Sequence, residues 1–224
     1  MRMEAKNMSY QAVIFDLDGT LLNTLDDLTD AVNYSLKKFD KPERTREEVC
    51  RFVGNGIAKL IERAVPMGTN ISETEKILDA FREYYGKHCQ DKTAPYRGIL
   101  ELLQQLKSQN IKLAVVSNKA DFAVQELIPV YFGNLFAVAK GENEAAGIRK
   151  KPAPDMVAAA LEELECPKEQ AVYVGDSDVD LLTAKNSKLP CIGVSWGFRG
   201  RTFLEENGAA MIADTPSDIL KFVY

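Results

Sequence analysis

Two aspartates with the spacing of a reactive pair, Asp16 and Asp18, lie in the run FDLDGTLL. On an extended chain, residues two apart point to roughly the same side, so the two carboxylates would lie close together. Such a pair costs free energy unless a cation or a raised pKa offsets the repulsion. A divalent ion would bind one carboxylate and leave its second oxygen as a nucleophile, while the other carboxyl group acts as acid and base. An acidic turn that closes a strand fits the pair equally well.

A second acidic group follows another apolar run, in the stretch GDSDVD that contains Asp176, Asp178 and Asp180. Asp176 is the candidate for a further oxygen ligand of the same ion. Ser177 and Asp178 suit the cap and first turn of a helix, where a hydroxyl and a negative charge are favourable. Asp180 has two interpretations, a hydrogen bond within the site or a place on a solvated face.

Anion-binding groups are the third feature. Ser117 and Asn118 come after an apolar run and before a helical stretch, where a hydroxyl and backbone N–H groups can hold an anion. An ordinary helix cap has the same geometry. Lys151 stands before Pro152 and Pro154, which stiffen the entry to a helix and would hold the ammonium where it neutralises a phosphoryl group. A solvated turn is the alternative for Lys151.

The elements that must position these groups alternate between strand and helix. Short apolar runs rich in β-branched residues predict strands buried on both faces, at Tyr10–Phe15, Lys112–Ser117, Phe136–Ala139, Ala171–Val174 and Cys191–Ser195. Helical spacing of apolar residues lies between them, over Gly98–Gln109 and Met156–Leu164. The pattern predicts an α/β protein with a doubly wound, Rossmann-like parallel sheet, whose ligands bind at the carboxyl ends of the strands.

One segment, residues 24–91, interrupts the alternation because it contains no convincing strand. Two apolar stripes at helical spacing, within Leu25–Phe39 and Ile77–His88, enclose shorter helical pieces at Glu47–Phe52 and Ile57–Val65 and a turn-prone stretch at Met67–Glu73. We therefore expect an all-helical cap over 24–91 and an α/β core made of 1–23 and 92–224.

Composition excludes several function classes. Lys and Arg total 28 against 33 Asp and Glu, a net charge of −5, which disfavours nucleic acid as a partner. No apolar run is long enough for a membrane span, and the first ten residues lack the apolar region of a secretion signal, so a cytoplasmic location is expected. A single histidine, His88, and four cysteines without a CxxC pair disfavour imidazole triads and zinc or redox sites.

The order of these groups resembles the four motifs of the haloacid dehalogenase superfamily of phosphotransferases. The matching positions are Asp16–Thr20, Ser117, Lys151 and Gly175–Asp180, and the resemblance covers nearly the whole chain. The helical insert resembles the small cap of the subgroup that contains phosphoglycolate phosphatases and β-phosphoglucomutases.

Within that insert, Gly54, Asn55 and Gly56 resemble a cap loop that presents backbone N–H groups to a substrate. A glycine-rich turn between helices fits the same residues. Asn23 departs from the family, because many relatives have an acidic residue there.

The resemblance implies a mechanism. Asp16 would attack phosphorus to form an aspartyl-phosphate, and Asp18 would protonate the leaving group and then activate water. Mg²⁺ would be bound by a side-chain oxygen of Asp16, the backbone carbonyl of Asp18 and a carboxylate oxygen of Asp176. Further implied roles are phosphate binding by Ser117, Lys151 and Asn118, and support by Gly19, Thr20 and Asp180.

The function expected is that of a Mg²⁺-dependent phosphatase acting on a small phosphorylated metabolite, most similar to phosphoglycolate phosphatase. A pyrophosphatase, a sugar-phosphate phosphatase and a β-phosphoglucomutase are alternatives within the superfamily. A non-catalytic receiver-type domain and a catalytically idle relative that binds a partner are alternatives outside enzyme catalysis, and both a monomer and a homodimer remain open.

Overall fold

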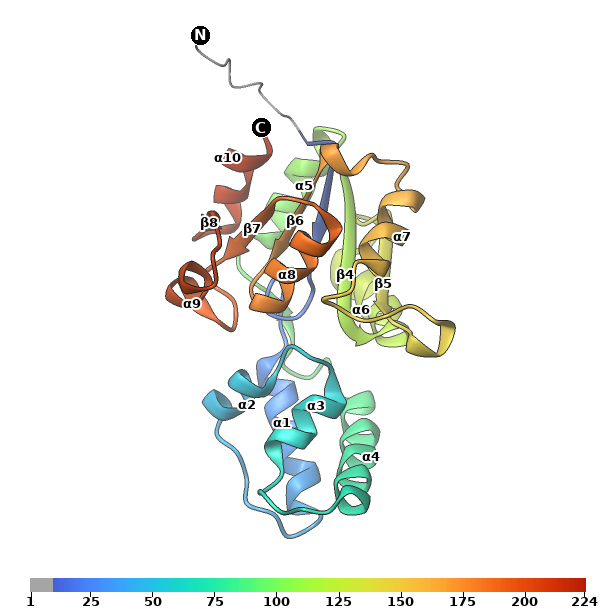
Figure 1. Cartoon of the computed structure of the whole chain (residues 1–224), viewed down its shortest axis with the longest axis vertical. Helices are drawn as coiled ribbons and strands as arrows, with labels where there is room; N and C mark the ends of the chain where they lie inside the picture. The colour runs from blue at the N-terminus through green and yellow to red at the C-terminus, as the bar shows by residue number, and fades with distance from the viewer. Residues whose placement is uncertain (1–9) are drawn as a thin grey trace. The chain divides into compact units, whose positions relative to one another are not determined.

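The computed structural model describes residues 10–224, and contacts divide the chain into two compact units (Figure 1). One unit joins the chain up to Thr20 to Arg97–Tyr224, and the other is Leu21–Tyr96. The helical unit thus extends a few residues beyond the expected 24–91 at each end. The segment in which we expect no secretion signal lies, except for Tyr10, outside the described residues.

The larger unit contains a six-stranded sheet in the order β5-β4-β1-β6-β7-β8, with every neighbouring pair parallel. Its strands are β1 (Ala12–Phe15), β4 (Lys112–Ala120), β5 (Val138–Glu142), β6 (Ala171–Gly175), β7 (Cys191–Val194) and β8 (Met211–Ala213). The five expected strands are all present with shifted ends. The edge strand β8 was not predicted, because three residues are too short to give a period.

Helices cover both faces of this sheet, as a doubly wound fold requires. Ile14 points to the face where α7 (Asp155–Glu163) and α8 (Asp178–Ser187) contribute to one buried cluster. Phe15 points to the other face, where its ring meets Phe136, which in turn packs on Phe132 of α6 (Asp121–Phe132). The remaining helices are α5 (Ile99–Ser108), α9 (Gly200–Glu206) and α10 (Leu220–Val223), with 3₁₀ turns at Glu144–Ala146, Lys168–Gln170 and Pro216–Ile219.

The smaller unit consists of α1 (Leu25–Lys37), α2 (Arg46–Phe52), α3 (Ile57–Ala64) and α4 (Ile71–His88), together with an antiparallel pair of two-residue strands, β2 (Leu22–Asn23) and β3 (Ala94–Pro95). The expected stripes form its core, where Val32, Ile77 and Phe81 are fully buried. The turn expected at Met67–Glu73 is shorter than predicted. Asn70 caps α4 by accepting a hydrogen bond from the Glu73 amide, so the helix already begins at Ile71.

None of the helices in residues 10–224 combines the length with the apolar character that crossing a bilayer requires.

Candidate active site

The sheet register brings the separate motifs to one edge. Phe15 pairs with Val115 on β4 and with Val174 on β6. Asp16 and Gly175, the next residues of β1 and β6, therefore lie at the same level of the sheet. The Asp16 amide donates a hydrogen bond to the Val174 carbonyl at 2.9 Å. The carboxyl ends of three parallel strands therefore carry the first, second and fourth motifs, which are far apart in the sequence.

Three buried carboxylates gather at this edge. Asp16, Asp176 and Asp180 each offer one oxygen, and these oxygens all lie within 4.8 Å of one another. Burial, followed by the charge of Asp180, raises the pKa of Asp16 to about 7. Burial, followed by the charges of Asp180 and Asp16, also raises the pKa of Asp176. The cluster holds negative charges that a cation would stabilise.

Lys151 is the buried cation of this cluster. Its Nζ lies 2.7 Å from Oδ1 of Asp16 and 2.8 Å from Oδ1 of Asp180. Burial opposes its charge, but the carboxylates of Asp16 and Asp180 outweigh that effect and raise the pKa of Lys151. With only 3% of its surface exposed, Lys151 does not lie on a solvated turn.

Asp180 positions Lys151 and does not lie on a solvated face, because none of its surface is exposed. Its Oδ2 accepts hydrogen bonds from the Ser177 amide and hydroxyl at 3.1 and 2.6 Å, as part of the capping box that starts α8. Its Oδ1 accepts from the Tyr173 hydroxyl at 3.1 Å, and that hydroxyl accepts from Lys151 at 3.2 Å. Tyr173 was not predicted, because nothing in its strand distinguishes it from a core residue. Asp178 takes the first position of α8, as expected.

Ser117 and Asn118 lie within β4, which continues to Ala120, so neither caps a helix. The residue before α6 is Ala120, and no side chain caps that helix. Ser117 is buried, and its hydroxyl accepts a hydrogen bond from the Lys119 amide at 3.2 Å. The side-chain amide of Asn118 holds the main chain of Lys151, accepting from its N–H at 2.7 Å and donating to its carbonyl at 3.1 Å. The Asn118 side chain thus positions Lys151, a role that the sequence did not predict.

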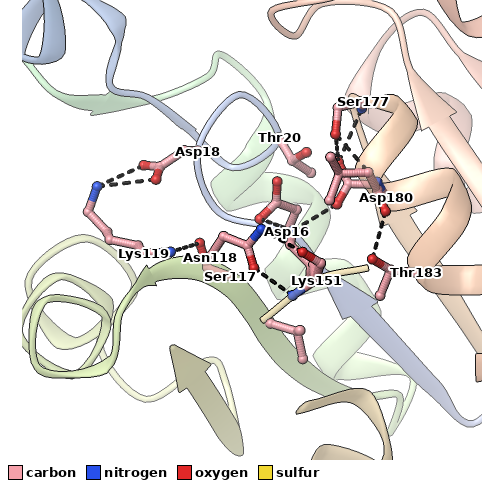
Figure 2. Close-up of polar contacts among 12 residues, drawn as sticks. Asp16, Asp18, Thr20, Ser117, Asn118, Lys119, Lys151, Ser177, Asp180 and Thr183 are labelled. Atoms are coloured by element: carbon pink, nitrogen blue, oxygen red, sulfur yellow. Dashed lines mark hydrogen bonds and ion pairs between the residues drawn. The ribbon is translucent and has the colours of Figure 1, made fainter. Parts of the chain in front are cut away.

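Asp18 directs its side chain toward Lys119, which carries no predicted role. The ammonium of Lys119 donates to both oxygens of Asp18, at 3.1 and 3.2 Å. Figure 2 shows this pair on one side of Asp16, with Lys151 and Asp180 on the other. A signal was available in the sequence, because Lys119 stands two residues after Ser117 on an extended strand and so points to the same side.

The loop after β1 is held by residues from the loop after β7. Gly19 has a φ of +88°, and a Cβ there would lie 2.5 Å from Oδ2 of Asp176, so glycine is required. Thr20 is fully buried; its hydroxyl lies 3.5 Å from Asp176, and its carbonyl accepts from the Trp196 indole at 3.0 Å. The Phe198 amide donates to Oδ2 of Asp176 at 2.7 Å. Trp196 and Phe198 were not predicted as parts of the site.

The expected cap loop lies in the helical unit, where Gly54 and Gly56 have φ values of +124° and +83°. Asn55 Oδ1 accepts from the Arg63 guanidinium at 2.8 Å, and the same group donates to the Phe52 carbonyl at 2.7 Å. Helix α3 therefore braces the loop. These contacts are compatible with both interpretations, a substrate-facing loop and a turn between helices.

A model of the haloacid dehalogenase-like hydrolase family matches residues 13–194. The chain belongs to this family. A phosphoglycolate phosphatase from Haemophilus influenzae is 31% identical over 222 residues, covering 96% of this chain and 98% of that protein. A Pseudomonas fluorescens phosphoglycolate phosphatase is 33% identical over 209 residues, covering 90% of this chain and 76% of that protein. The family and these relatives show that the chain is a phosphatase.

Solved structures agree with the fold of a haloacid dehalogenase-like hydrolase. A possible phosphoglycolate phosphatase from Lactobacillus delbrueckii subsp. bulgaricus has 38% identity and a TM-score of 0.92, covering 96% of this chain and 99% of that chain. CbbY from Rhodobacter sphaeroides, solved in complex with phosphate, has 27% identity and a TM-score of 0.72, covering 94% of this chain and 96% of that chain.

The donor set of this haloacid dehalogenase-like hydrolase fits Mg²⁺. The clustered ligand atoms are all carboxylate oxygens, which hard divalent cations prefer. Both oxygens of Asp180 already accept hydrogen bonds from Lys151, Tyr173 and Ser177. Asp16 and Asp176 are better suited to an ion, because Oδ1 of Asp176 has only the long contact with the Thr20 hydroxyl at 3.5 Å and Oδ1 of Asp16 is the oxygen that lies next to Lys151.

Proposed function

We propose that the protein is a Mg²⁺-dependent phosphatase that hydrolyses a small phosphate monoester through an aspartyl-phosphate, with 2-phosphoglycolate as the first candidate substrate. The observation that supports this best is the convergence of Asp16, Asp176 and Lys151 in one buried cluster at the carboxyl ends of β1 and β6. The curated relatives that carry the name phosphoglycolate phosphatase support the choice of substrate.

The first step is an in-line displacement at phosphorus. A carboxylate oxygen of Asp16 forms the new O–P bond while the bond to the leaving alkoxide breaks, and Asp18 gives its proton to that alkoxide. In this proposal Lys151 and Ser117 hold phosphoryl oxygens. The contacts of Lys151 with Asn118 and Asp180 support its role, because they keep it in position. Asp16, Ser117, Lys151 and Asp180 are buried, so little of Asp16 is open to water.

The second step regenerates Asp16. Asp18, now a carboxylate, takes a proton from water, and the resulting hydroxide attacks phosphorus and breaks the bond to Asp16. Mg²⁺, held by Asp16, Asp176 and the backbone carbonyl of Asp18, would supply positive charge that offsets the charge on the phosphoryl group.

A phosphate-release screen with Mg²⁺ tests the proposal, using 2-phosphoglycolate, pyrophosphate, sugar phosphates and β-glucose 1-phosphate. We expect turnover of at least one monoester, and acid quenching during turnover of a ³²P-labelled ester should trap label on Asp16. Turnover of pyrophosphate alone, or conversion of glucose 1-phosphate without phosphate release, would instead establish a pyrophosphatase or a mutase. A receiver-type domain would take up label without turnover, and an idle relative would do neither.

The variant Asp16→Asn should lose activity by several orders of magnitude, because an amide oxygen is a poor nucleophile. The substitution preserves shape, so far-UV circular dichroism should match that of the wild type. Activity within tenfold of the wild type would exclude Asp16 as the nucleophile.

A further inference from the structure

Tyr173 carries a hydroxyl into the interior of the larger unit, at a position where a phenylalanine ring would fill the same space. The residue lies in β6, is fully buried, and shares one core cluster with Ile14 of β1 and Val116 of β4. Placing a phenolic hydroxyl in an apolar core costs free energy unless the hydroxyl is hydrogen-bonded. The partners of this hydroxyl are therefore informative, and two of them belong to the candidate active site.

The Tyr173 hydroxyl both accepts and donates hydrogen bonds. It accepts from the Lys151 ammonium at 3.2 Å, and it lies 3.1 Å from Oδ1 of Asp180 and 3.5 Å from the Val116 carbonyl. Burial, followed by the charge of Asp180, raises the pKa of Tyr173, so the hydroxyl keeps its single proton. The carboxylate of Asp180 is the favoured acceptor of that proton, because it is closer than the carbonyl and a charged acceptor forms the stronger hydrogen bond.

Lys151, Tyr173 and Asp180 close a ring of three hydrogen bonds. Nζ of Lys151 lies 2.8 Å from Oδ1 of Asp180, the same oxygen that accepts from Tyr173. Nζ also lies 5.9 Å from the centre of the Tyr173 ring, so the ammonium meets the hydroxyl end of the ring and not its face. Two acceptors lie close together on one side of the ammonium, and this arrangement directs an N–H group to Asp16, whose Oδ1 is 2.7 Å away.

The ring joins the flexible end of Lys151 to a rigid strand. Lys151 belongs to neither a helix nor a strand, and Asn118 holds only its main chain, which leaves a flexible four-carbon stem to be fixed. Tyr173 pairs with Ile14 on one neighbouring strand and with Cys191 on the other, and every residue of β6 is buried. Groups built on such strands are held more precisely than groups on loops.

We propose that Tyr173 is a positioning residue of the reaction, whose hydroxyl, together with Asp180, fixes the Lys151 ammonium beside Asp16, where it stabilises the phosphoryl group in the transition state. This inference rests on the proposed phosphatase function and adds to it a residue that acts only through its neighbours. Asp180 alone leaves the ammonium with one acceptor on that side, and the hydroxyl supplies the second.

Tyr173→Phe tests this role, because it removes the hydroxyl and leaves the ring. For the ester that the wild type hydrolyses fastest, we expect kcat to fall by about tenfold, the size of one hydrogen bond to a charged group, while KM changes less than twofold. Far-UV circular dichroism should match that of the wild type. A loss of stability alone would reduce the amount of folded enzyme and leave the kcat of each folded molecule unchanged.

Binding of orthovanadate, which mimics the phosphoryl group in the transition state, gives a second readout that requires no turnover. With Mg²⁺ present, its Kd from isothermal titration calorimetry should rise about tenfold in Tyr173→Phe. In the background of Lys151→Met, the same substitution should change the Kd less than twofold, because the ammonium through which Tyr173 acts is gone.

Tyr10→Phe is the matched control. Tyr10 is also a buried tyrosine, 8% exposed, but it precedes β1 whereas Asp16 follows that strand. Removal of its hydroxyl should leave kcat and the Kd for orthovanadate within twofold of the wild-type values.

The possible failures are distinguishable. Wild-type kcat and orthovanadate affinity in Tyr173→Phe would overturn the positioning role while the phosphatase function stands. A change confined to KM, an undiminished effect in the Lys151→Met background, or equal losses in Tyr10→Phe would do the same. Absence of phosphate release by the wild type from every ester in the screen would overturn the phosphatase function, and this inference with it.

Discussion

At the scale of single residues, burial raises the pKa values of two carboxyl groups of the site, those of Asp16 and Asp176. Burial and the charge of Asp180 raise the pKa of Asp16 from 3.8 to about 7, and burial also raises the pKa of Asp176. At pH values between the unfolded and native pKa of Asp16, the native metal-free protein binds more protons than the unfolded chain. Stability therefore falls as the pH rises, with the loss spread from about pH 4 to about pH 7.

In the presence of a chelator we expect the Tm to decrease as the pH is raised from 5.5 to 8, measured by differential scanning fluorimetry. Asp16→Asn removes one of the titrating groups, so its Tm should depend less on pH and exceed that of the wild type at pH 8. A wild-type Tm that rises across this range would contradict the raised pKa values.

At the scale of elements, the loop between β7 and α9 packs so closely on the site at Gly197 that this position leaves no room for a Cβ. A Cβ on Gly197 would lie 2.2 Å from Cβ of Asp176 and 2.5 Å from the Gly19 carbonyl, so either the loop or the Asp176 side chain, a proposed ligand of the ion, would have to move. A displacement of about 1 Å in a site of this kind can reduce activity roughly a hundredfold. This loop, rather than only the strand ends, determines where Asp176 lies.

Gly197→Ala should therefore lower kcat/KM by at least tenfold and also destabilise the protein. Gly86→Ala is the matched control, because Gly86 lies within α4 and nothing approaches within 4 Å of the position of its Cβ. Alanine is the better helix former, so this control should raise stability by roughly 0.5–1 kcal/mol. Chemical denaturation measures the stability of both variants, and a steady-state assay measures their kcat/KM. Normal activity of Gly197→Ala would contradict the tight packing at this position.

At the scale of the whole molecule, the charges of the site do not balance without a cation once its carboxylates are ionised. Four carboxylates, those of Asp16, Asp18, Asp176 and Asp180, face two ammonium groups, Lys119 and Lys151. A ligand that binds only the native state stabilises the entire fold, by about 2.7 kcal/mol at a concentration one hundred times its Kd. The effect of a divalent ion should therefore extend beyond catalysis to global stability.

We expect a chelator to abolish activity and lower the Tm, and Mg²⁺ in excess to restore both. Asp176→Asn should respond much less to Mg²⁺ in the same thermal assay. Full turnover after exhaustive chelation, or a Tm unaffected by Mg²⁺ in the wild type, would contradict the proposed ion.

The sequence alone determined the α/β fold, the helical insert and the positions of the motifs. Strand period, helix period and the polar residues after each strand are local properties, and parallel strands necessarily bring their carboxyl ends to one edge. Only the tertiary structure decided which polar groups pair across that edge. Tyr173 and Asp180 bind Lys151, and Asn118 holds its main chain, through contacts between residues up to 33 positions apart. Likewise, β4 continues past Ser117 to Ala120, which pairs with Glu142 of β5, and Lys119 is buried there beside Asp18. Both contacts join residues that are distant in the sequence, so no local pattern encodes them.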